Sequence, residues 1–291
     1  MKNLDALLNP AVPRILILGG TGRVGGLLRR AWDARGGHAG LRPVWQGRRM
    51  DDGVDTVFDP LENPEALKAA VLACDVVLNL AGTPHGSAQE MRQHRLLAEA
   101  ARDACAGERP LIVASSAAVY GATEGLLSED LPLAPVSAYG LAKQDMEAAV
   151  AGSPLCAAVR IGNIAGADAL LGQSPPPEGY RLHVLNDGET LRRSYIGPQA
   201  LAFALVRLAR LMACGVEVPP VLNIALPGVV SMAGLLEAAG NAWTAAAAPS
   251  EAIAAVELDV SRAIRVGLVP EAPATPEKVV EDWLSVVGAI Q

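Results

Sequence analysis

The segment Gly19-Gly-Thr-Gly22-Arg-Val-Gly25-Gly26 indicates a variant of the dinucleotide-binding fold. It follows directly on the apolar run Arg14 to Leu18, which predicts a buried strand, and it leads into a helical pattern from Arg23 to Arg35. Glycines let the backbone turn sharply and approach a phosphate, while the amide groups at a helix start attract anions. The sequence therefore predicts a loop that binds the pyrophosphate of a dinucleotide. For this motif taken alone, a glycine-rich turn without a ligand is the alternative.

Short apolar runs alternate with longer helical patterns along the chain. The further strands are expected at Arg42–Gln46, Asp75–Leu80, Leu111–Ser115, Leu155–Ile161 and Pro220–Ala225. The further helices are expected at 64–73, 88–105, 137–151, 198–214, 231–239 and 277–289. Apolar strands that alternate with helices predict an α/β fold of Rossmann type, a doubly wound parallel sheet covered on both faces.

The same pattern suggests a second, smaller unit. We expect a dinucleotide-binding domain at 1–165, continued by 198–226, and a small discontinuous C-terminal substrate lobe formed by 166–197 and 227–291. Between Gly166 and Arg193, the run Pro175-Pro-Pro177 and several glycines break the periodic pattern. This segment is expected to be an excursion that faces the substrate.

Composition and charge exclude several classes of protein. The chain has 291 residues and a net charge of 24 − 31 = −7. Its sequence has no basic stripe with interleaved aromatic residues, so nucleic-acid binding is not expected. No run is long and apolar enough for an export signal or a membrane span, so a cytoplasmic protein is expected. Four dispersed cysteines are expected to be core thiols in a reducing compartment, and no cluster has the spacing of metal ligands. The expected partner is a small-molecule substrate.

Tyr139 and Lys143 are four residues apart, which places both side chains on the same face of a helix. A lysine in that position lowers the pKa of a phenol from about 10 towards neutrality. For the spacing alone, an ordinary solvated turn is the alternative. The pair Ser115-Ser116 ends the preceding strand, and the order of glycine loop, serine pair and tyrosine–lysine pair predicts acid–base chemistry beside a dinucleotide.

The end of the second strand bears on the choice of dinucleotide. The sequence there is Val44-Trp-Gln-Gly-Arg48-Arg49, with Gln46 where an acid would bind the free 2′-hydroxyl of NAD and Arg48 just beyond. Positive charge suits a 2′-phosphate, so NADP is expected and NAD is the alternative. Two further alternatives stay open: Asp51 and Asp52 reach that pocket in another register, or the arginines form a solvated turn.

These motifs, in this order, resemble the extended branch of the short-chain dehydrogenase/reductase superfamily, the NAD-dependent epimerase/dehydratase family, over nearly the whole chain. The glycine loop resembles that branch's TGxxGxxG, and Ala114–Gly121 and Tyr139–Lys143 resemble its catalytic segments. The resemblance implies that Ser116, with Ser115 as the alternative, hydrogen-bonds a substrate carbonyl. It further implies that Tyr139 transfers the proton, and that Lys143 lowers the phenol pKa and holds the nicotinamide ribose.

The resemblance also implies a set of contacts. Phe58–Leu61 is similar to the acidic site beside adenine, and Leu78–Gly82 to the strand end that lines the cofactor. The residues expected at the cofactor are Gly19, Thr21, Gly22, Arg23, Val24, Gly25, Arg48, Asp59, Pro60, Leu80, Ala81, Gly82, Tyr139 and Lys143. At the substrate we expect Asn163, Arg193 and His85; the alternatives are a turn-capping asparagine, a surface arginine and a solvated loop histidine.

Departures from the family pattern limit what the resemblance implies. Gly197-Pro198 replaces an acidic pair, and Ala245–Pro249 lacks the second arginine that clamps a diphosphate. On the helix before Leu111, either His94 or Glu90 stands in place of the family's asparagine. The expected activity is therefore that of an NAD(P)-dependent oxidoreductase on a hydroxyl/carbonyl substrate. The alternatives are a nucleotide-sugar epimerase or dehydratase and a non-catalytic NAD(P)-binding regulatory protein; a homodimer is compatible with the resemblance.

Overall fold

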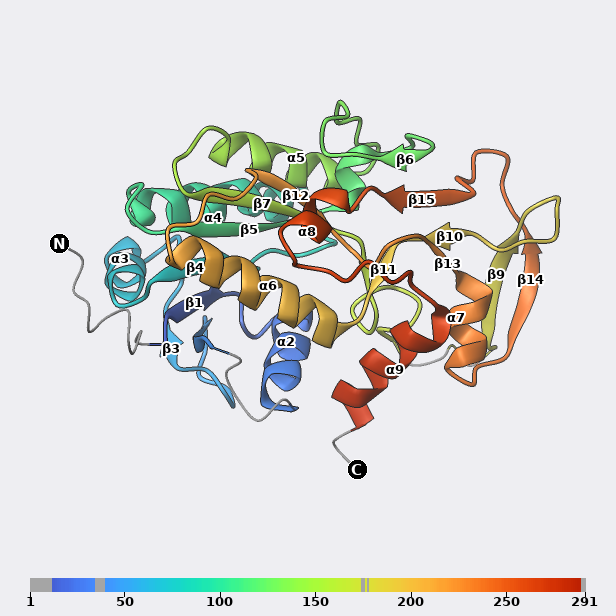
Figure 1. Cartoon of the computed structure of the whole chain (residues 1–291), viewed down its shortest axis with the longest axis horizontal. Helices are drawn as coiled ribbons and strands as arrows, with labels where there is room; N and C mark the ends of the chain where they lie inside the picture. The colour runs from blue at the N-terminus through green and yellow to red at the C-terminus, as the bar shows by residue number, and fades with distance from the viewer. Residues whose placement is uncertain (1–11, 35–39, 174–175, 177, 289–291) are drawn as a thin grey trace.

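A seven-stranded parallel sheet, in the order β12-β7-β5-β4-β1-β2-β3, forms the centre of the protein (Figure 1). The computed structural model describes residues 12–34, 40–173, 176 and 178–288. The strands are β1 (Arg14–Leu18), β2 (Arg42–Gly47), β3 (Thr56–Val57), β4 (Val76–Asn79), β5 (Leu111–Ser116), β7 (Cys156–Ile161) and β12 (Val221–Ile224). The strand order reverses direction between β1 and β4, and in such sheets ligands bind at the carboxyl ends beside that point.

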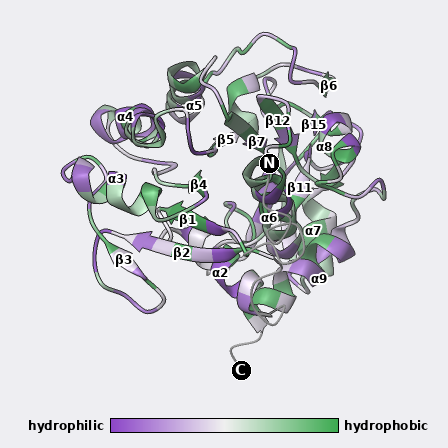
Figure 2. Ribbon diagram, turned by 60° about the vertical axis from the view of Figure 1, so that its left-hand side comes forward, coloured by the Kyte–Doolittle hydropathy of each residue, from purple (hydrophilic) through white to green (hydrophobic). Residues whose placement is uncertain are grey.

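Helices cover both faces of this sheet. Figure 2 shows α3 (Pro64–Leu72), α4 (Ala88–Cys105) and α5 (Ala138–Val150) together on one side, and α2 (Arg23–Ala34) and α6 (Pro198–Ala213) on the other. Side chains of β1 alternate between the two layers: Ile15 and Ile17 pack with α2 and α6, whereas Leu16 and Leu18 pack with α3 and α4. Burial on both faces explains why the strands read as continuous apolar runs.

Local capping residues determine where the helices of the site begin. Ser87 and Glu90 form a reciprocal capping box at the start of α4, in which each side chain accepts from the other residue's backbone amide. Ser137 Oγ accepts from the amide of Gly140 at 3.0 Å at the start of α5. Asn63 caps α3, whose first residue is Pro64. These caps place the first turns of α4 and α5 beside the carboxyl ends of β4 and β5.

Three small sheets lie beyond the carboxyl ends, and β9, β14 and α7 (Met232–Ala238) form the far end of the molecule (Figure 1). A short 3₁₀ helix, η1 (Ala117–Tyr120), and α8 (Ser261–Arg265) complete this region. The additional strands are β6 (Leu126–Leu127), β8 (Asn163–Ile164), β9 (Tyr180–Val184), β10 (Arg192–Arg193), β11 (Tyr195–Ile196), β13 (Val230–Ser231), β14 (Trp243–Ala247) and β15 (Ala255–Leu258). The pairs β6–β15 and β8–β11 join segments on both sides of the expected domain boundaries, so the division at 165, 198 and 226 stays a prediction.

The last helix, α9 (Pro276–Val287), packs against α2, α6 and α7. Its residue Asp282 accepts hydrogen bonds from the amides of Gln199 at 2.7 Å and Ala200 at 3.0 Å, in the first turn of α6. The N-cap of α6 is Gly197, which has no side chain to do this, and a Cβ there would lie 2.2 Å from Asp282 Cγ. The helix start is therefore capped by a residue more than eighty positions later in the chain.

The α/β fold with a doubly wound parallel sheet is confirmed, and the expected strands and helices are present to within a residue or two at most ends. The expected helix ends at Arg35 and Ala289, and the prolines at 175 and 177, lie outside the described residues. Among the described residues, no helix combines the length and apolarity that crossing a bilayer requires. Of the four cysteines, Cys74 and Cys105 are buried, but Cys214 is exposed, so its prediction as a core thiol is wrong.

Candidate active site

A cleft of about 390 Å³ opens at the carboxyl ends of β1, β4, β5 and β7. It brings together the glycine loop, the end of β4, the serine pair and the first turns of α5, which are far apart in the sequence. Of the residues predicted at the cofactor, those that line it are Gly19, Gly22, Arg23, Val24, Gly25, Leu80, Gly82, Tyr139 and Lys143. Ser116 and Asn163 line it as well.

The glycine loop has the shape that a pyrophosphate requires. Gly19 adopts a φ of +79°, and a Cβ there would lie 2.7 Å from the Cα of Ala81. At Gly25 a Cβ would lie 2.5 Å from the carbonyl oxygen of Gly20. Because α2 begins at Arg23, its first residues line the cleft and its dipole favours an anion there. The loop therefore fits a dinucleotide by its backbone, independently of any side chain.

Contrary to the expectation from the sequence, Gln46 does not face the cofactor pocket. It is buried, its Oε1 accepts from the amide of Gly19 at 3.1 Å, and its Nε2 donates to the carbonyl oxygen of Phe58 at 2.5 Å. The side chain ties the glycine loop to β2, so the interpretation of Gln46 as the counterpart of a ribose-binding acid is wrong. Gly47 ends β2, and Arg48 is exposed directly after it.

Tyr139 and Lys143 share one face of α5, as the spacing predicts. The Lys143 ammonium lies 5.6 Å from the centre of the Tyr139 ring and donates to the carbonyl oxygen of Ala114 at 2.6 Å. Ser116 ends β5 and faces the phenol, with which it forms a hydrogen bond, while its Oγ also accepts from the amide of Ala118 at 3.2 Å. The three side chains predicted to carry acid–base chemistry are therefore together.

The pKa values of this cluster are set by burial. Burial raises the pKa of Tyr139 above its usual value of about 10, and the hydrogen bond with Ser116 opposes the rise. The prediction that Lys143 lowers the pKa of Tyr139 below its usual value is therefore wrong for this structure. Burial also lowers the pKa of Lys143 to about 8, while the negative charge of Glu147 opposes the change. Each group has its charged form disfavoured because little water reaches it.

His94, rather than Glu90, reaches the cleft from α4. Its ring is buried and meets the Tyr139 ring edge to face, with centres 5.7 Å apart and planes inclined by 73°. Nε2 lies 2.8 Å from the carbonyl oxygen of Thr83. Burial lowers the pKa of His94 to about 4, and the nearby charge of Lys143 adds to the effect. Glu90 instead accepts from Ser87 in the capping box.

Ser115, the alternative catalytic serine, also lines the cleft, but its hydroxyl is already engaged in a hydrogen bond. Its hydroxyl donates to Glu147, which also forms a buried ion pair with Arg160 at 2.8 Å. Arg160 in turn donates to the hydroxyl of Tyr120 at 3.0 Å. We call Ser115, Glu147, Arg160, Tyr120 and Asn223 the buried network. Ser116 is thus the serine that remains available to a ligand.

The residues predicted at the substrate are not gathered in one place. Asn163 lines the cleft, but His85 is an exposed loop residue outside its lining. Arg193 also lies outside it, because its guanidinium donates to the carbonyl oxygens of Arg192 at 2.7 Å and Ile253 at 3.0 Å. That arginine therefore links β10 to the segment before β15, and the structure does not place it at a substrate.

Sequence reasoning missed Asp168. It lines the cleft in the segment predicted to face the substrate, and its Oδ2 accepts from the hydroxyl of Tyr195 at 2.5 Å. Burial raises its pKa, and the hydrogen bond from Tyr195 opposes the rise. Beside it, Arg23 donates to the carbonyl oxygen of Ala167 at 3.1 Å. The Oδ1 of Asp168 accepts from the amide of Leu171 at 3.0 Å, as in an ordinary turn, so the local sequence does not mark Asp168 as a cleft residue; the tyrosine that holds Oδ2 is distant in the sequence.

The other residues expected at the cofactor do not line the cleft. Asp59 Oδ1 accepts from the amide of Leu61 at 2.8 Å, which makes it a turn cap. Ala81 packs under Gly19. The residues outside the lining are Thr21, Arg48, Asp59, Pro60 and Ala81. An adenosine half that extends from the glycine loop along β2 would run in their direction, and their contacts stay predictions.

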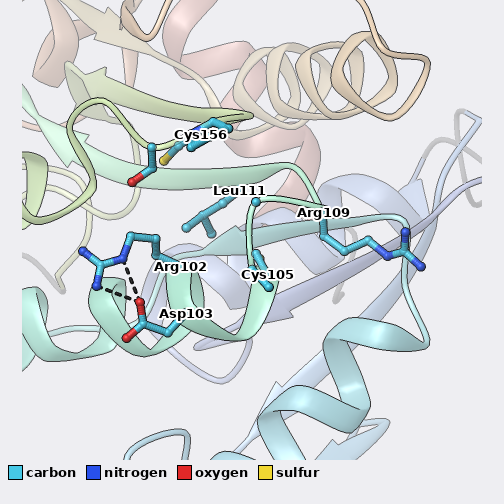
Figure 3. A pocket seen from close by; sticks show the side chains of 10 residues that line it. Arg102, Asp103, Cys105, Arg109, Leu111 and Cys156 are labelled. Carbon is cyan, nitrogen blue, oxygen red and sulfur yellow. Dashed lines mark hydrogen bonds and ion pairs between the residues drawn. The ribbon is translucent and has the colours of Figure 1, made fainter.

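A second hollow, of about 420 Å³, lies at the opposite edge of the sheet, where β5 and β7 begin. Figure 3 shows Arg102 and Asp103 paired with one another there, while the side chain of Arg109 extends away from them. Burial raises the pKa of Cys105 to about 12 and that of Cys156 to about 11, so neither thiol is an effective nucleophile. This hollow therefore offers less chemistry than the cleft.

Comparisons with known proteins give one family match and several solved structures with a similar fold. Residues 15–154 match the NAD dependent epimerase/dehydratase family. A search of curated proteins gives no significant match. Among solved structures, the UDP-Glc/GlcNAc 4-epimerase of Campylobacter jejuni has a TM-score of 0.73 at 18% identity, with 95% of this chain and 99% of that chain covered.

Two further structures contain the dinucleotide. The UDP-glucose-4-epimerase of Stenotrophomonas maltophila, with bound NAD and formylated UDP-arabinopyranose, has a TM-score of 0.71 at 22% identity, covering 95% and 98% of the two chains. A short-chain dehydrogenase/reductase superfamily protein of Agrobacterium tumefaciens with bound NAD has a TM-score of 0.68 at 19% identity, covering 95% and 97%. At these identities the likeness shows the fold alone. Residues 15–154, which match the NAD dependent epimerase/dehydratase family, hold the glycine loop, Ser116, Tyr139 and Lys143.

Proposed function

We propose that the protein is an NAD(P)-dependent oxidoreductase that acts on a hydroxyl/carbonyl substrate, with Tyr139 as the acid–base group. The observation that carries this proposal is the meeting of Ser116, Tyr139 and Lys143 in one cleft with the glycine loop. Groups with burial-shifted pKa values, gathered in a cleft at the switch point of a parallel sheet, are typical of catalytic sites. The bound nicotinamide would supply the hydride chemistry.

Each side chain has a role that its surroundings support. The hydroxyl of Ser116 donates to the carbonyl oxygen of the substrate. The phenol of Tyr139 gives its proton to that oxygen during reduction and takes it back during oxidation. Lys143 holds the ribose hydroxyls through its ammonium, whose position is fixed by the carbonyl of Ala114. Because burial raises its pKa, the phenol carries its proton at neutral pH, which suits carbonyl reduction.

We further propose NADP as the preferred dinucleotide and NAD as the second choice. Gly47, at the end of β2, carries no carboxylate that would repel a 2′-phosphate, and the exposed Arg48 follows it. Arg48→Ala should weaken NADP binding by roughly tenfold and leave NAD binding nearly unchanged, as measured by titration of the tryptophan fluorescence. Equal losses for both dinucleotides would remove this reason for preferring NADP.

The proposal as a whole is tested with the purified full chain. It is mixed with NADP or NAD, oxidised or reduced, and a panel of UDP-glucose, UDP-glucuronic acid, UDP-N-acetylglucosamine and simple alcohols and ketones. Turnover is followed by the absorbance of the reduced nicotinamide. Tyr139→Phe should lower turnover by roughly 10³-fold while cofactor binding, read as a thermal shift, stays intact. Unchanged turnover in that variant would refute the role of Tyr139.

The second candidate is a nucleotide-sugar epimerase or dehydratase, as the names of several structural neighbours suggest. Such an enzyme keeps its dinucleotide, so it releases an isomer or a dehydrated sugar without net change in nicotinamide absorbance. Arg193, the expected anchor for a diphosphate, lies outside the cleft lining, which favours the oxidoreductase. Chromatography of the UDP-sugar reactions separates the two. Dinucleotide binding without any product would favour the regulatory alternative instead.

A further inference from the structure

His94 is the one histidine that lines the cleft within the part of the chain the structure describes. Its ring is 1% exposed and is anchored by the contact between Nε2 and the carbonyl oxygen of Thr83. Since a carbonyl can only accept, Nε2 carries the proton in this contact. Nδ1 is buried and has no hydrogen-bond partner among the described residues. The imidazole is thus held as one neutral tautomer.

The backbone beside His94 is shaped around its ring. Gly82 has a φ of +139°, and a Cβ on it would lie 2.2 Å from Cε1 of His94 and 2.3 Å from Nδ1. Any residue with a side chain at position 82 would displace the ring. Gly82 and Thr83 follow β4 and line the cleft where the dinucleotide is expected. His94 therefore touches the cofactor side of the cleft through both of these residues.

On its other side the same ring contacts the phenol of Tyr139, edge to face at 5.7 Å. The phenol is surrounded by groups from three elements: His94 from α4, Lys143 from the next turn of α5, and Ser116 from the end of β5. A charged imidazole would face the ammonium of Lys143, and burial together with that charge keeps His94 neutral. The contact is therefore one of shape rather than of charge.

We propose that His94 is a positioning residue for Tyr139: it fixes the phenol relative to the Gly82–Thr83 segment after β4 and so holds the acid–base group in register with the cofactor. The inference rests on the proposed function, because register matters only where proton and hydride transfer are coupled. It predicts that a ring is required at position 94 and that a charge is not. A misplacement of about 1 Å in such a site can cost on the order of 10²-fold in rate.

Two variants and a control separate positioning from mere stability. His94→Ala removes the ring, His94→Phe keeps a ring but loses the bond to Thr83, and Leu97→Ala truncates a buried neighbour on α4 outside the cleft lining. With the substrate found in the panel, His94→Ala should lower kcat between about 10- and 100-fold with the KM for the dinucleotide nearly unchanged. His94→Phe should restore kcat to within about threefold. Leu97→Ala should lower the thermal midpoint without lowering kcat.

A second readout needs no substrate. Long-range ¹H–¹⁵N spectra of the full chain should show the His94 imidazole as the neutral Nε2–H tautomer throughout the range between about pH 5 and 8. An imidazole that gains a proton in that range would overturn the inference, as would an unchanged kcat in His94→Ala. If either result is found while Tyr139→Phe is inactive, the role of His94 is refuted and the proposed function still stands. If Tyr139→Phe keeps its turnover, the proposed function fails and this inference with it.

Discussion

Helix α5 carries two polar clusters one turn apart, and they differ in how well their groups are partnered. Glu147 belongs to the buried network, in which Arg160 binds it at 2.8 Å and Ser115 donates to it. Tyr120 and Asn223 extend that network with a bond of 2.8 Å. Its members satisfy one another, which is how buried polar groups are tolerated in a stable core.

The cleft cluster, only four residues earlier on the helix, is poorly partnered by comparison. Burial lowers the pKa of Lys143 to about 8 and that of His94 to about 4, and it raises the pKa of Tyr139. Nδ1 of His94 also has no hydrogen-bond partner among the residues that the structure describes. We therefore expect the network to contribute to folding stability, and the cleft cluster, if it acts as proposed, to retain poorly partnered groups at some cost in stability.

The largest expected effect comes from Lys143→Met, which should lower the activity without lowering the stability of the fold. Turnover on the substrate from the panel should fall by up to about 10⁴-fold, equivalent to roughly 5 kcal/mol of transition-state stabilisation. The free energy of unfolding at neutral pH should not fall, because the variant removes an ammonium whose charged form is disfavoured by burial. Urea denaturation and steady-state kinetics check both parts. A large loss of stability would place Lys143 with the network instead.

Glu147→Ala should do the reverse and destabilise the fold by about 3–5 kcal/mol, because it leaves the guanidinium of Arg160 buried without its partner. The double variant Glu147→Met with Arg160→Met should recover much of that loss. A matched control is Glu99→Ala, which breaks the more exposed pair with Arg95 and should cost only about 0.3–0.5 kcal/mol. Urea denaturation of the four proteins measures the effects, and equal losses for Glu147→Ala and Glu99→Ala would contradict the assignment.

His94 makes stability depend on pH. Its pKa in the folded chain is about 4, below the ordinary 6.5, so the unfolded chain binds a proton that the folded chain resists. The stability associated with neutral His94 is complete above about pH 6.5 and is lost as the pH falls towards 4, by about 3 kcal/mol in all. The free energy of unfolding, measured by denaturation at a series of pH values in this range, should depend less on pH for His94→Phe than for the wild type. An equal pH dependence of the two proteins would show that the pKa of His94 does not change on unfolding.

The smallest effect is expected from Tyr120→Phe within the network. It removes the hydroxyl that donates to Asn223 at 2.8 Å and accepts from Arg160 at 3.0 Å, which should cost about 1–2 kcal/mol of stability. Turnover should stay at the wild-type level, because Tyr120 does not line the cleft. Thermal denaturation and the hydride assay on one preparation test this. A fall in turnover would show that the two clusters are coupled through β5.

Features that depend on local sequence were predictable. The helix from Ala88 to Cys105 was predicted with its observed ends from its helical pattern, and the capping box of Ser87 and Glu90 is a local feature that fixes its start. The strand Arg14–Leu18 and the glycine loop follow from an apolar run and from backbone geometry that only glycine permits. Tyr139 and Lys143 share a face because a helix has a fixed period.

Features that depend on distant partners were not predictable. The strands Tyr180–Val184 and Trp243–Ala247 pair with one another across some sixty residues, and the alanine run in the second has no strand pattern of its own. Asp168 was missed because Tyr195 and burial, rather than a motif, place it in the cleft. Arg193 was expected at a substrate because its segment resembles one that contacts a pyrophosphate in some members of the family. Nothing in the local sequence indicates that the carbonyl oxygen of Ile253 accepts its hydrogen bond instead.

The capping of α6 by Asp282 has a consequence for the order in which the chain matures on the ribosome. The amides of Gln199 and Ala200 obtain these acceptors only when α9 has been synthesised and has docked. A nascent chain that stops before Pro276 would carry the sheet and its covering helices with one helix start left to water. The start of α6 therefore depends on a helix that follows it by more than sixty residues, and the two helices are expected to become ordered together.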